Sequence, residues 1–528
     1  MASRRFLGGM LSGAGSVVVR QGLNLALVPV VIYYLGVEPF GLYMMLVGLQ
    51  ELTQLLDLGF GNAAVRLLSA TQADRDRPDN AQSRRELMTI AHSLFALLGA
   101  LAVGAGFALA PAFPVWFGVS PALADVSRLA LILMAIEGGL TLYVSYFRAL
   151  LLSHCLHQWS NIADTVYNLV GIGGGLAMVA FGYGLPGLLA ARLLGALLKI
   201  AIITTHALRV EPMAFWPGVA FCRASFIKLV SLTGHAMAVN VSVIVSHKID
   251  TLVIGAFLGV SSVGYYEMAF RLPGSALQLC VRISEGAFPL FARFMTPACA
   301  ASADTDKEKA RLLFLRMSAL NGFLISMMLL AITFYYPDLF RLFSAGKMAL
   351  GPSLAVLAVS VPIIWSGALQ IPACYFLYAA NRQRYLTVSS VLAALANVVI
   401  SLALVKPFGI VGVALGTLIP QLIQHQFSLI AESCRELGVS LRTYLAAVHG
   451  PTLVAVLGAW AALTLIETLL PHGGASRLLE IAATVSLVLG LATWAWFTWT
   501  ASAAERAMAR DVLLAPLQRR LRRADPIP

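Results

Sequence analysis

One stretch of the sequence carries polar and charged side chains at helical spacing within apolar surroundings. Six of them follow at intervals of three or four positions: Glu267, Arg271, Ser275, Gln278, Arg282 and Glu285. This spacing places all six on one face of an α-helix, and at 1.5 Å per residue that face is about 27 Å long. Since charged groups in an apolar medium need water or polar partners, such a face is typical of a helix that lines an aqueous path.

Shorter polar faces occur on other predicted helices. The side chains that we predict to line one path are Arg20, Asn24, Gln54, Asp57, Arg192, Lys199, Glu267, Arg271, Gln278 and Arg282. Their cations would suit an anionic group, because Arg and Lys bind phosphate and carboxylate oxygens. Four acids are candidates for carrying a coupled proton or sodium ion: Glu137, Asp164, Asp250 and Glu285. The alternative is that these charges pair with one another and only fasten helices together.

The elements that must position these residues are those of a membrane protein. The chain has 528 residues, of which 59% are hydrophobic and only 12% are charged. Apolar stretches long enough to cross a bilayer as helices predict about fourteen spans, near residues 14–36, 41–65, 87–111, 123–147, 160–181, 184–206, 229–257, 263–290, 313–336, 351–379, 385–404, 409–431, 446–469 and 478–500. The predicted fold class is therefore an all-α polytopic membrane protein.

The net charge of +12 follows the topology and is not concentrated in one domain. With the N-terminus in the cytoplasm, alternate loops place most Lys and Arg residues on the cytoplasmic side, as the positive-inside rule requires. We therefore predict that both termini are cytoplasmic and that nucleic acid is not a partner. The Arg-rich tail would contact anionic membrane lipids.

The chain contains an internal duplication. The matching residues are Leu35-Gly36-Val37, Gly41 and Tyr43 with Leu258-Gly259-Val260, Gly264 and Tyr266; Tyr146-Phe147, Ser160 and Asn168 with Tyr375-Phe376, Ser389 and Asn397; and Gly184 and Gly187 with Gly409 and Gly412. Each repeat holds six predicted helices, an even number, so both repeats have the same orientation in the membrane. The predicted regions are a six-helix lobe at 1–208, a cytoplasmic linker at 209–228, a second lobe at 229–431, two further helices at 432–505 and a basic tail at 506–528.

Sequence motifs for cofactors and catalysis are not found. The sequence has no Walker A motif, which argues against ATP-driven transport. Its six cysteines form no CxxC pair, and the histidines at 154 and 157 have no carboxylate near them in sequence. We therefore predict no cofactor and no bound metal. The short loops also favour a protein that is not an enzyme.

Two segments resemble a known family. Leu35-Gly36-x-x-x-Phe40-Gly41-x-Tyr43, Asp57-x-Gly59 and Arg66 resemble the opening of polysaccharide-biosynthesis flippases, and Asp250, Gly255-x-x-Leu258-Gly259, Gly264-x-Tyr266, Ala269 and Arg271 resemble their second half. These O-antigen and oligosaccharide flippases are part of the multidrug/oligosaccharidyl-lipid/polysaccharide (MOP) superfamily. The resemblance implies two lobes that move undecaprenyl-diphosphate-linked oligosaccharide between the leaflets of a bacterial inner membrane by alternating access. It also implies cations on the first and eighth helices, where Arg20 and Arg271 stand.

Other functions stay open at this point. A lipid II flippase would differ only in the glycan, and a multidrug/cation antiporter of the same superfamily would be expected to have an acidic cavity. A membrane glycan polymerase or ligase would need catalytic groups on an extracytoplasmic loop, and those loops are short here. The expected partners are the lipid-linked oligosaccharide, anionic lipids and other polysaccharide-assembly proteins. The energy source is either the membrane potential or a coupled proton or sodium ion.

Overall fold

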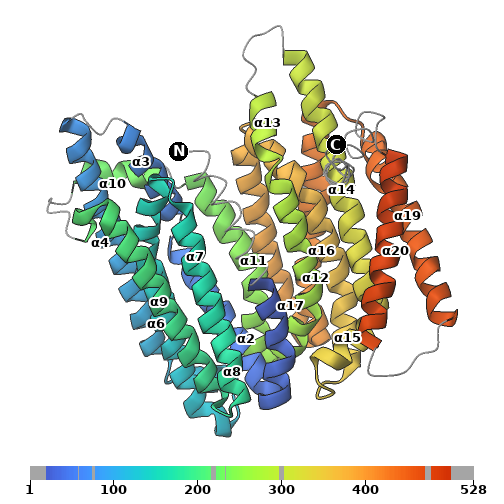
Figure 1. The fold of residues 1–528 in the computed structure, drawn as a ribbon, viewed down its shortest axis with the longest axis horizontal. Coiled ribbons are helices and arrows are strands. Elements are labelled where there is room, and N and C mark those ends of the chain that lie inside the picture. Colours follow the sequence, from blue (N-terminus) through green and yellow to red (C-terminus); the bar gives the residue numbers. More distant parts are fainter. Residues whose placement is uncertain are drawn as a thin grey trace, which may run out of the picture. The chain divides into compact units, whose positions relative to one another are not determined.

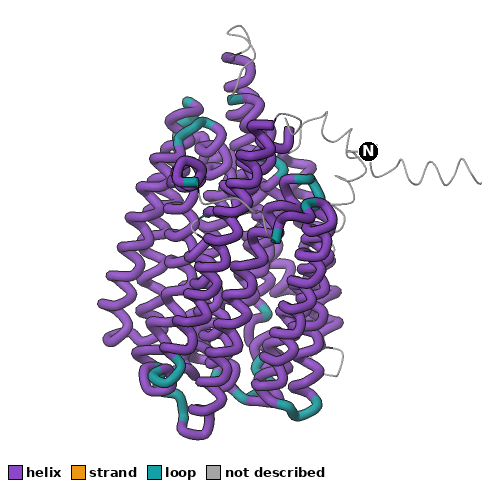
Figure 2. The backbone as a smooth tube through the Cα atoms, turned by 90° about the vertical axis from the view of Figure 1, so that its left-hand side faces the viewer, coloured by secondary structure: helices purple, strands orange, loops and turns teal. Residues whose placement is uncertain are grey.

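A computed structural model of the chain describes residues 20–57, 59–73, 78–215, 222–231, 234–295, 303–469 and 477–500. Throughout these residues the regular secondary structure is helical and no strand occurs (Figures 1 and 2). Ten helices within the described segments are long and apolar enough to cross a membrane. The predicted all-α membrane fold is confirmed.

The first described helix of the first half covers residues 20–35. This half continues with α2 (Val37–Thr53), η1 (Gln54–Asp57), α3 (Phe60–Ala73), α4 (Pro78–Leu109), α5 (Phe113–Trp116), η2 (Pro121–Leu123), α6 (Ala124–Ser153), α7 (His157–Tyr167), η3 (Asn168–Gly173), α8 (Gly174–Ala180), α9 (Gly184–Val210) and η4 (Pro212–Ala214). Here η1, η2 and η4 are 3₁₀-helices, and η3 is a π-helix. The helices α4, α6 and α9 pack side by side (Figure 1).

The second half contains α10 (Arg223–Ser231), α11 (Gly234–Leu258), α12 (Val260–Glu285), α13 (Phe288–Phe294), α14 (Ala303–Phe334), α15 (Tyr336–Phe343), α16 (Leu350–Ala379), α17 (Gln383–Leu422), the π-helix η6 (Ile423–Ile430), α18 (Ala431–Leu437), α19 (Leu441–Leu469) and α20 (Arg477–Thr500). Each predicted span overlaps described helices. The ten long apolar spans leave out the helix at 20–35, the interrupted α2–α3 pair and α12, and they include both arms of α17 in one span. The total number of crossings stays a prediction.

The duplication found in the sequence is visible in the backbone. The repeat-related Gly36 and Gly259 have φ angles of 98° and 81°, and the repeat-related Gly184 and Gly409 have φ angles of 63° and 58°. Glycine adopts positive φ at little cost because it has no Cβ. Gly409 reverses the chain inside α17, which is therefore two helices. The same turn chemistry thus begins the sixth predicted helix of each repeat.

Glycine also allows the two repeats to approach each other closely where α2 meets the start of α12. A Cβ atom at Gly41 would lie 1.9 Å from the Val260 carbonyl oxygen and 3.2 Å from the backbone nitrogen of Gly264, its repeat-related residue. Small residues at helix crossings let backbones approach in this way. The contact links the beginning of the second helix of one repeat to that of the other.

We expect Gly41→Ala to lower the free energy of unfolding by about 1–3 kcal/mol, because the added methyl group meets backbone that cannot rotate away. Thermal unfolding of the purified protein in detergent would measure this change. Gly104→Ala on α4 is the matched control, since nothing lies within 4 Å of a Cβ atom there. Equal unfolding temperatures for the two variants would contradict the close crossing.

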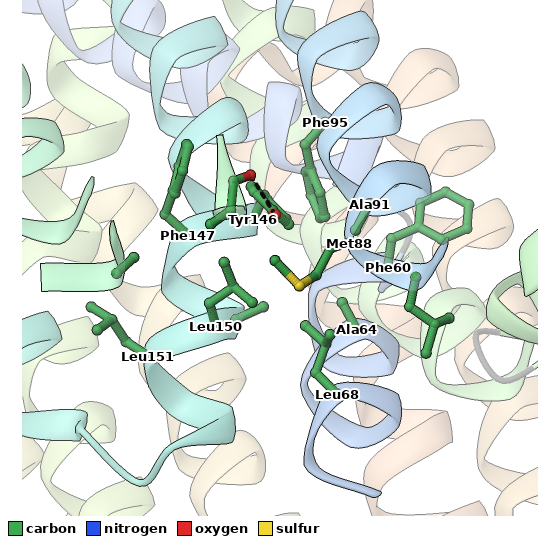
Figure 3. Close-up of a cluster of buried hydrophobic side chains, with 14 of the residues drawn as sticks. Phe60, Ala64, Leu68, Met88, Ala91, Phe95, Tyr146, Phe147, Leu150 and Leu151 are labelled. Carbon is green, nitrogen blue, oxygen red and sulfur yellow. Dashed lines mark hydrogen bonds between the residues drawn. The ribbon is translucent and has the colours of Figure 1, made fainter. Parts of the chain in front are cut away.

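A buried apolar cluster holds the first repeat together (Figure 3). Its labelled members are Phe60, Ala64 and Leu68 on α3, Met88, Ala91 and Phe95 on α4, and Tyr146, Phe147, Leu150 and Leu151 on α6. The Tyr146 hydroxyl donates a hydrogen bond of 2.8 Å to the carbonyl oxygen of Ala214, beyond the end of α9. The cluster therefore ties the segment after α9 to α6.

An ion pair fixes the same segment from another side. The buried Arg84 guanidinium on α4 lies 2.8 Å from Glu211 Oε1 and donates a 2.7 Å hydrogen bond to the Leu68 carbonyl oxygen. His154 Nε2 lies 3.1 Å from the same Glu211 oxygen. Since both charged partners are buried, removing one leaves the other without compensation.

Arg84→Met is expected to lower the free energy of unfolding by about 3–5 kcal/mol, because Glu211 would stay buried without its cation. The double variant Arg84→Met/Glu211→Gln should recover much of that loss, since it leaves no unpaired charge. Denaturant titration of the purified variants in detergent distinguishes these cases. If the double variant were no more stable than the single one, the ion pair would not carry the effect.

The described residues fall into two compact units. The first unit takes in 1–275, 336–366 and 381–429, and the second takes in 276–335, 367–380 and 430–528. The division passes through α12 and α16, so it does not follow the boundaries at 208 and 229 that the duplication suggested. The predicted lobes, linker and tail remain predictions, and the tail lies outside the described residues.

Candidate functional site

A buried ion pair stands in the middle of the first repeat. Arg192 on α9 donates from Nε to Glu137 Oε2 at 3.2 Å and from Nη2 to Glu137 Oε1 at 3.0 Å. The side chains of Arg192 and Glu137 are only 7% and 2% exposed. Arg192 also donates to the Tyr43 hydroxyl at 2.7 Å, the Gln50 Oε1 at 2.7 Å and the Tyr167 hydroxyl at 2.8 Å. Every nitrogen of the guanidinium therefore has a partner.

Both members of this ion pair were named as functional residues in the sequence analysis. Arg192 was predicted to line the substrate path and Glu137 to carry a coupled ion. In this structure each neutralises the other, and a buried pair with satisfied hydrogen bonds avoids the cost of an isolated charge in the membrane. Direct contact of either side chain with a substrate or ion stays a prediction.

A second cluster has more positive than negative charge. Asp164 Oδ1 on α7 lies 2.6 Å from Arg148 Nη2 on α6 and 3.0 Å from Lys199 Nζ on α9. The Arg148 and Asp164 side chains are both 31% exposed. Two cations share one carboxylate, so the cluster has a net charge of +1 and can attract an anion. The structure brings the predicted residues Asp164 and Lys199 together and adds Arg148.

A third group of contacts joins the two repeats within the first unit. Arg271 on α12 donates from Nη2 to the Asn24 backbone oxygen at 3.1 Å and to Asn24 Oδ1 at 3.4 Å. Lys248 Nζ on α11 lies 2.6 Å from Glu51 Oε2 on α2. Glu267, one turn before Arg271, is half-buried and forms no ion pair with Arg271. The predicted residues Asn24 and Arg271 are therefore in contact across the repeats.

Asp250 lies among buried polar side chains of the second repeat, a cluster that we call the Asp250 pocket. It is 1% exposed, and its Oδ2 accepts hydrogen bonds from the Tyr266 hydroxyl at 2.6 Å and the Thr417 hydroxyl at 2.5 Å. The Asn397 amide donates to Thr417 Oγ1 at 2.7 Å. The remaining oxygens, Asp250 Oδ1 and Asn397 Oδ1, are buried and accept no hydrogen bond from the described residues.

The donor set of this pocket restricts what it could hold. Among the described residues no group of three or more His, Cys, Asp and Glu side chains could bind a metal ion. One carboxylate surrounded by neutral oxygens is a weak site for a divalent ion, but it suits a proton or a monovalent cation with oxygen ligands. Asp250 was a candidate for ion coupling in the sequence, and its surroundings fit that role.

Three predicted path residues lie in or near helix ends of the first unit. Asp57 Oδ1 accepts a 2.9 Å hydrogen bond from the backbone nitrogen of Gly61, so it caps the start of α3. Gln54 is half-buried in η1, next to this helix interruption. Arg20 is half-buried at the first described position and forms no ion pair with any residue of the described segments. Their contact with substrate stays a prediction.

The last residues of the predicted polar stripe belong to the second unit. The stripe does lie on one helix, α12, although Pro273 interrupts its hydrogen bonding. Gln278, Arg282 and Glu285 are exposed, and Arg282 Nη1 lies 3.1 Å from Glu285 Oε1. Arg282 and Glu285, predicted for the path and for ion coupling, therefore pair with each other in this structure.

Comparison with known proteins identifies the family. Residues 6–295, more than half of the chain, match the polysaccharide biosynthesis protein family. The chain belongs to this family. The resemblance noted in the sequence is thereby confirmed.

A curated relative of this family member is a probable flippase, AglR, of Haloferax volcanii. The two sequences are 23% identical over 270 residues, which is 50% of this chain and 52% of the relative. The chain thus matches about half the length of this relative.

Solved structures show the fold. A lipid II flippase, MurJ, in an inward closed conformation has a TM-score of 0.70 at 13% sequence identity, covering 93% of this chain and 99% of MurJ. An inward-facing multidrug resistance transporter of the MATE family and the MOP superfamily has a TM-score of 0.61 at 13% identity, covering 80% of this chain and 98% of that protein. The family member therefore shares the fold of MurJ along almost its whole length.

Sequence reasoning missed several residues of these clusters. Its lists of path and ion-coupling residues did not include Arg148, Lys248 or Glu51. Thr417 was not considered either, and Asn397 was used only as a mark of the repeat. An uncharged Thr or Asn gives no signal of its own. Its role depends on Asp250, which is more than 140 residues away in sequence.

Proposed function

We propose that this family member is a flippase that moves undecaprenyl-diphosphate-linked oligosaccharide from the inner to the outer leaflet of a bacterial inner membrane. Transport proceeds by alternating access without ATP and serves the biosynthesis of a surface polysaccharide such as O-antigen, lipopolysaccharide or exopolysaccharide. The single observation that supports this most strongly is the contact of Arg271 with Asn24, which places a cation at the junction of the two repeats.

The charge of the polar clusters favours an anionic substrate. The Arg192–Glu137 and Lys248–Glu51 pairs are neutral, whereas the Arg148–Asp164–Lys199 cluster carries one excess positive charge. Arg271 donates its hydrogen bonds to the uncharged Asn24, and Glu267, one turn before it on α12, offsets its charge without forming an ion pair with it. A diphosphate would be attracted by this surplus, because charge-assisted hydrogen bonds to phosphate are strong where water is excluded. The sugar hydroxyls would form hydrogen bonds with the neutral polar side chains.

The contacts between the repeats also supply a way to couple binding to movement. Arg271 with Asn24 and Lys248 with Glu51 connect helices of the first repeat to helices of the second. A phosphate group that binds Arg271 or Lys248 competes with these internal partners. Substrate binding would then loosen the junction, and the repeats would separate on that side. A ligand shifts a conformational equilibrium only through such a difference in its contacts between the two states.

Asp250 is our candidate for ion coupling. Its pocket offers an unsatisfied carboxylate oxygen and an unsatisfied amide oxygen to a proton or a sodium ion. The membrane potential is an additional source of energy, because moving one charge across it is worth about 2.3 kcal/mol per 100 mV. An anionic head group that travels outward moves with an inside-negative potential.

A lipid II flippase is the second candidate function. The similarity to MurJ over almost the whole chain favours it, and the diphosphate would be the same. A multidrug antiporter is a weaker candidate, since the excess positive charge of the Arg148–Asp164–Lys199 cluster would repel cationic drugs. We expect other polysaccharide-assembly proteins as partners, and anionic lipids at the tail 506–528.

The experiment that tests the proposal is complementation of a bacterium that lacks its O-antigen flippase. The intact gene should restore surface glycan, whereas Arg271→Ala and Asn24→Ala should restore much less at matched protein levels. Arg128→Ala is the control, because Arg128 is exposed and, among the described residues, forms its one ion pair with Asp125, three positions before it. Rescue of a strain depleted of its lipid II flippase, and not of the O-antigen strain, would favour the second candidate.

A further inference from the structure

Each of the two repeats contains a buried polar pocket, and the two pockets have a tyrosine at matching positions of the duplication. Tyr43 and Tyr266 occupy matching positions of the duplication. The Tyr43 hydroxyl accepts a 2.7 Å hydrogen bond from Arg192, and the Tyr266 hydroxyl donates a 2.6 Å hydrogen bond to Asp250. Each hydroxyl therefore contacts the principal charged group of its own pocket.

A second pair of matching positions completes both pockets. The spacing that relates Gly184 to Gly409 also relates Arg192 to Thr417, since each lies eight residues after its glycine. Arg192 bonds to Glu137, and Thr417 bonds to Asp250. In each repeat, the residue at this position binds the buried acid of the pocket.

The pockets differ in how the acid is neutralised. In the first repeat the Arg192 guanidinium lies against both oxygens of Glu137. In the second repeat the matching residue is the uncharged Thr417, and Asp250 forms no ion pair with any residue that the structure describes. A buried carboxylate requires a cation or a proton. The first pocket has its own cation, and the second has to take one from solution.

We propose that the Arg192 side chain is a covalently attached cation that occupies a latent sodium site, that is, a site which would bind sodium if the guanidinium were absent. Each chain would therefore take up one exchangeable cation, in the second repeat, and not two. Removing the guanidinium would leave four oxygen-bearing side chains that now accept its hydrogen bonds: Glu137, Tyr43, Gln50 and Tyr167. Carboxylate, amide and hydroxyl oxygens are suitable ligands for a hard cation. The number of coupled ions rests on the proposed function of Asp250, whereas the latent site at Glu137 does not.

The experiment is to measure sodium binding to the purified full-length protein by equilibrium dialysis with radioactive sodium. Arg192→Thr, which copies the second repeat, should bind about one more sodium ion per chain than the parent. Arg192→Thr/Glu137→Gln should show no gain, because the acid is gone, and Arg192→Lys should show none because the cation is kept. Absence of a gain in folded Arg192→Thr would overturn the proposal.

The sodium counts distinguish a failure of the latent site at Glu137 from a failure of the ion-coupling role proposed for Asp250. If the parent binds no sodium but Arg192→Thr gains one ion, the assignment of sodium to Asp250 fails and the latent site stands. If Arg192→Thr does not fold, the proposal still requires that adding Glu137→Gln restores the yield of folded protein, because the unpaired acid is then removed. A double variant with no better yield than the single variant would show that Arg192 is not the counter-cation of Glu137.

Discussion

Asp250→Asn is expected to abolish the response of transport to an ion gradient while leaving the fold intact. Asparagine has the same shape, and its oxygen can still accept hydrogen bonds from Tyr266 and Thr417. It has no charge to attract a proton or a sodium ion. We expect flipping under an imposed gradient to fall by on the order of tenfold, which corresponds to about 1.4 kcal/mol. The measurement is the flipping rate in proteoliposomes with and without sodium and proton gradients.

The control for this prediction is Asp125→Asn, which removes an acid whose side chain is 94% exposed. Its gradient response should equal that of the parent. The prediction fails if Asp250→Asn keeps the full response to both gradients. In that case another of the candidate acids, Glu137, Asp164 or Glu285, would carry the coupled ion.

Arg271→Ala should reduce flipping of a diphosphate-linked lipid by at least about tenfold, because it removes both the cation and the contact with Asn24. Arg271→Lys should retain part of the activity. Lysine keeps the charge, but it does not reproduce the geometry with which a guanidinium binds two oxygens at once. Initial flipping rates of reconstituted variants, at equal amounts of folded protein, would test this order.

Arg128→Ala serves again as the matched control, since it removes an exposed arginine from a helix of the first repeat. If Arg271→Ala and Arg128→Ala flip at the same rate, Arg271 is structural and its place at the junction has no role in recognition. Undiminished flipping by Arg271→Lys alone would instead show that charge suffices and that guanidinium geometry is unimportant.

The sequence predicted the fold well because its signals are local. Long apolar stretches indicated the helices, and short matches such as Gly36 with Gly259 indicated the duplication, since positive φ favours glycine at both positions. The sequence also separated the spans 385–404 and 409–431, and in the structure Gly409, with non-helical backbone angles, divides α17 into two helices at this point.

The site was predicted only in part, because its chemistry depends on distant partners. Helical spacing identified Arg192 and Glu137 separately, but only the structure shows that they neutralise each other. The contact of Arg271 with Asn24 joins residues that are 247 positions apart. One sequence contains no information on such pairs, whereas the packing of the helices determines them.

The most direct test of the proposed function is a flipping assay with purified protein in liposomes that contain a fluorescent undecaprenyl-diphosphate-linked sugar and no ATP. We predict that the protein moves the probe between leaflets faster than protein-free liposomes do, and that Arg271→Ala abolishes most of the increase. Folded protein that fails to accelerate the probe, with any of several glycans and with or without a membrane potential, would contradict the assignment as a flippase of diphosphate-linked lipids.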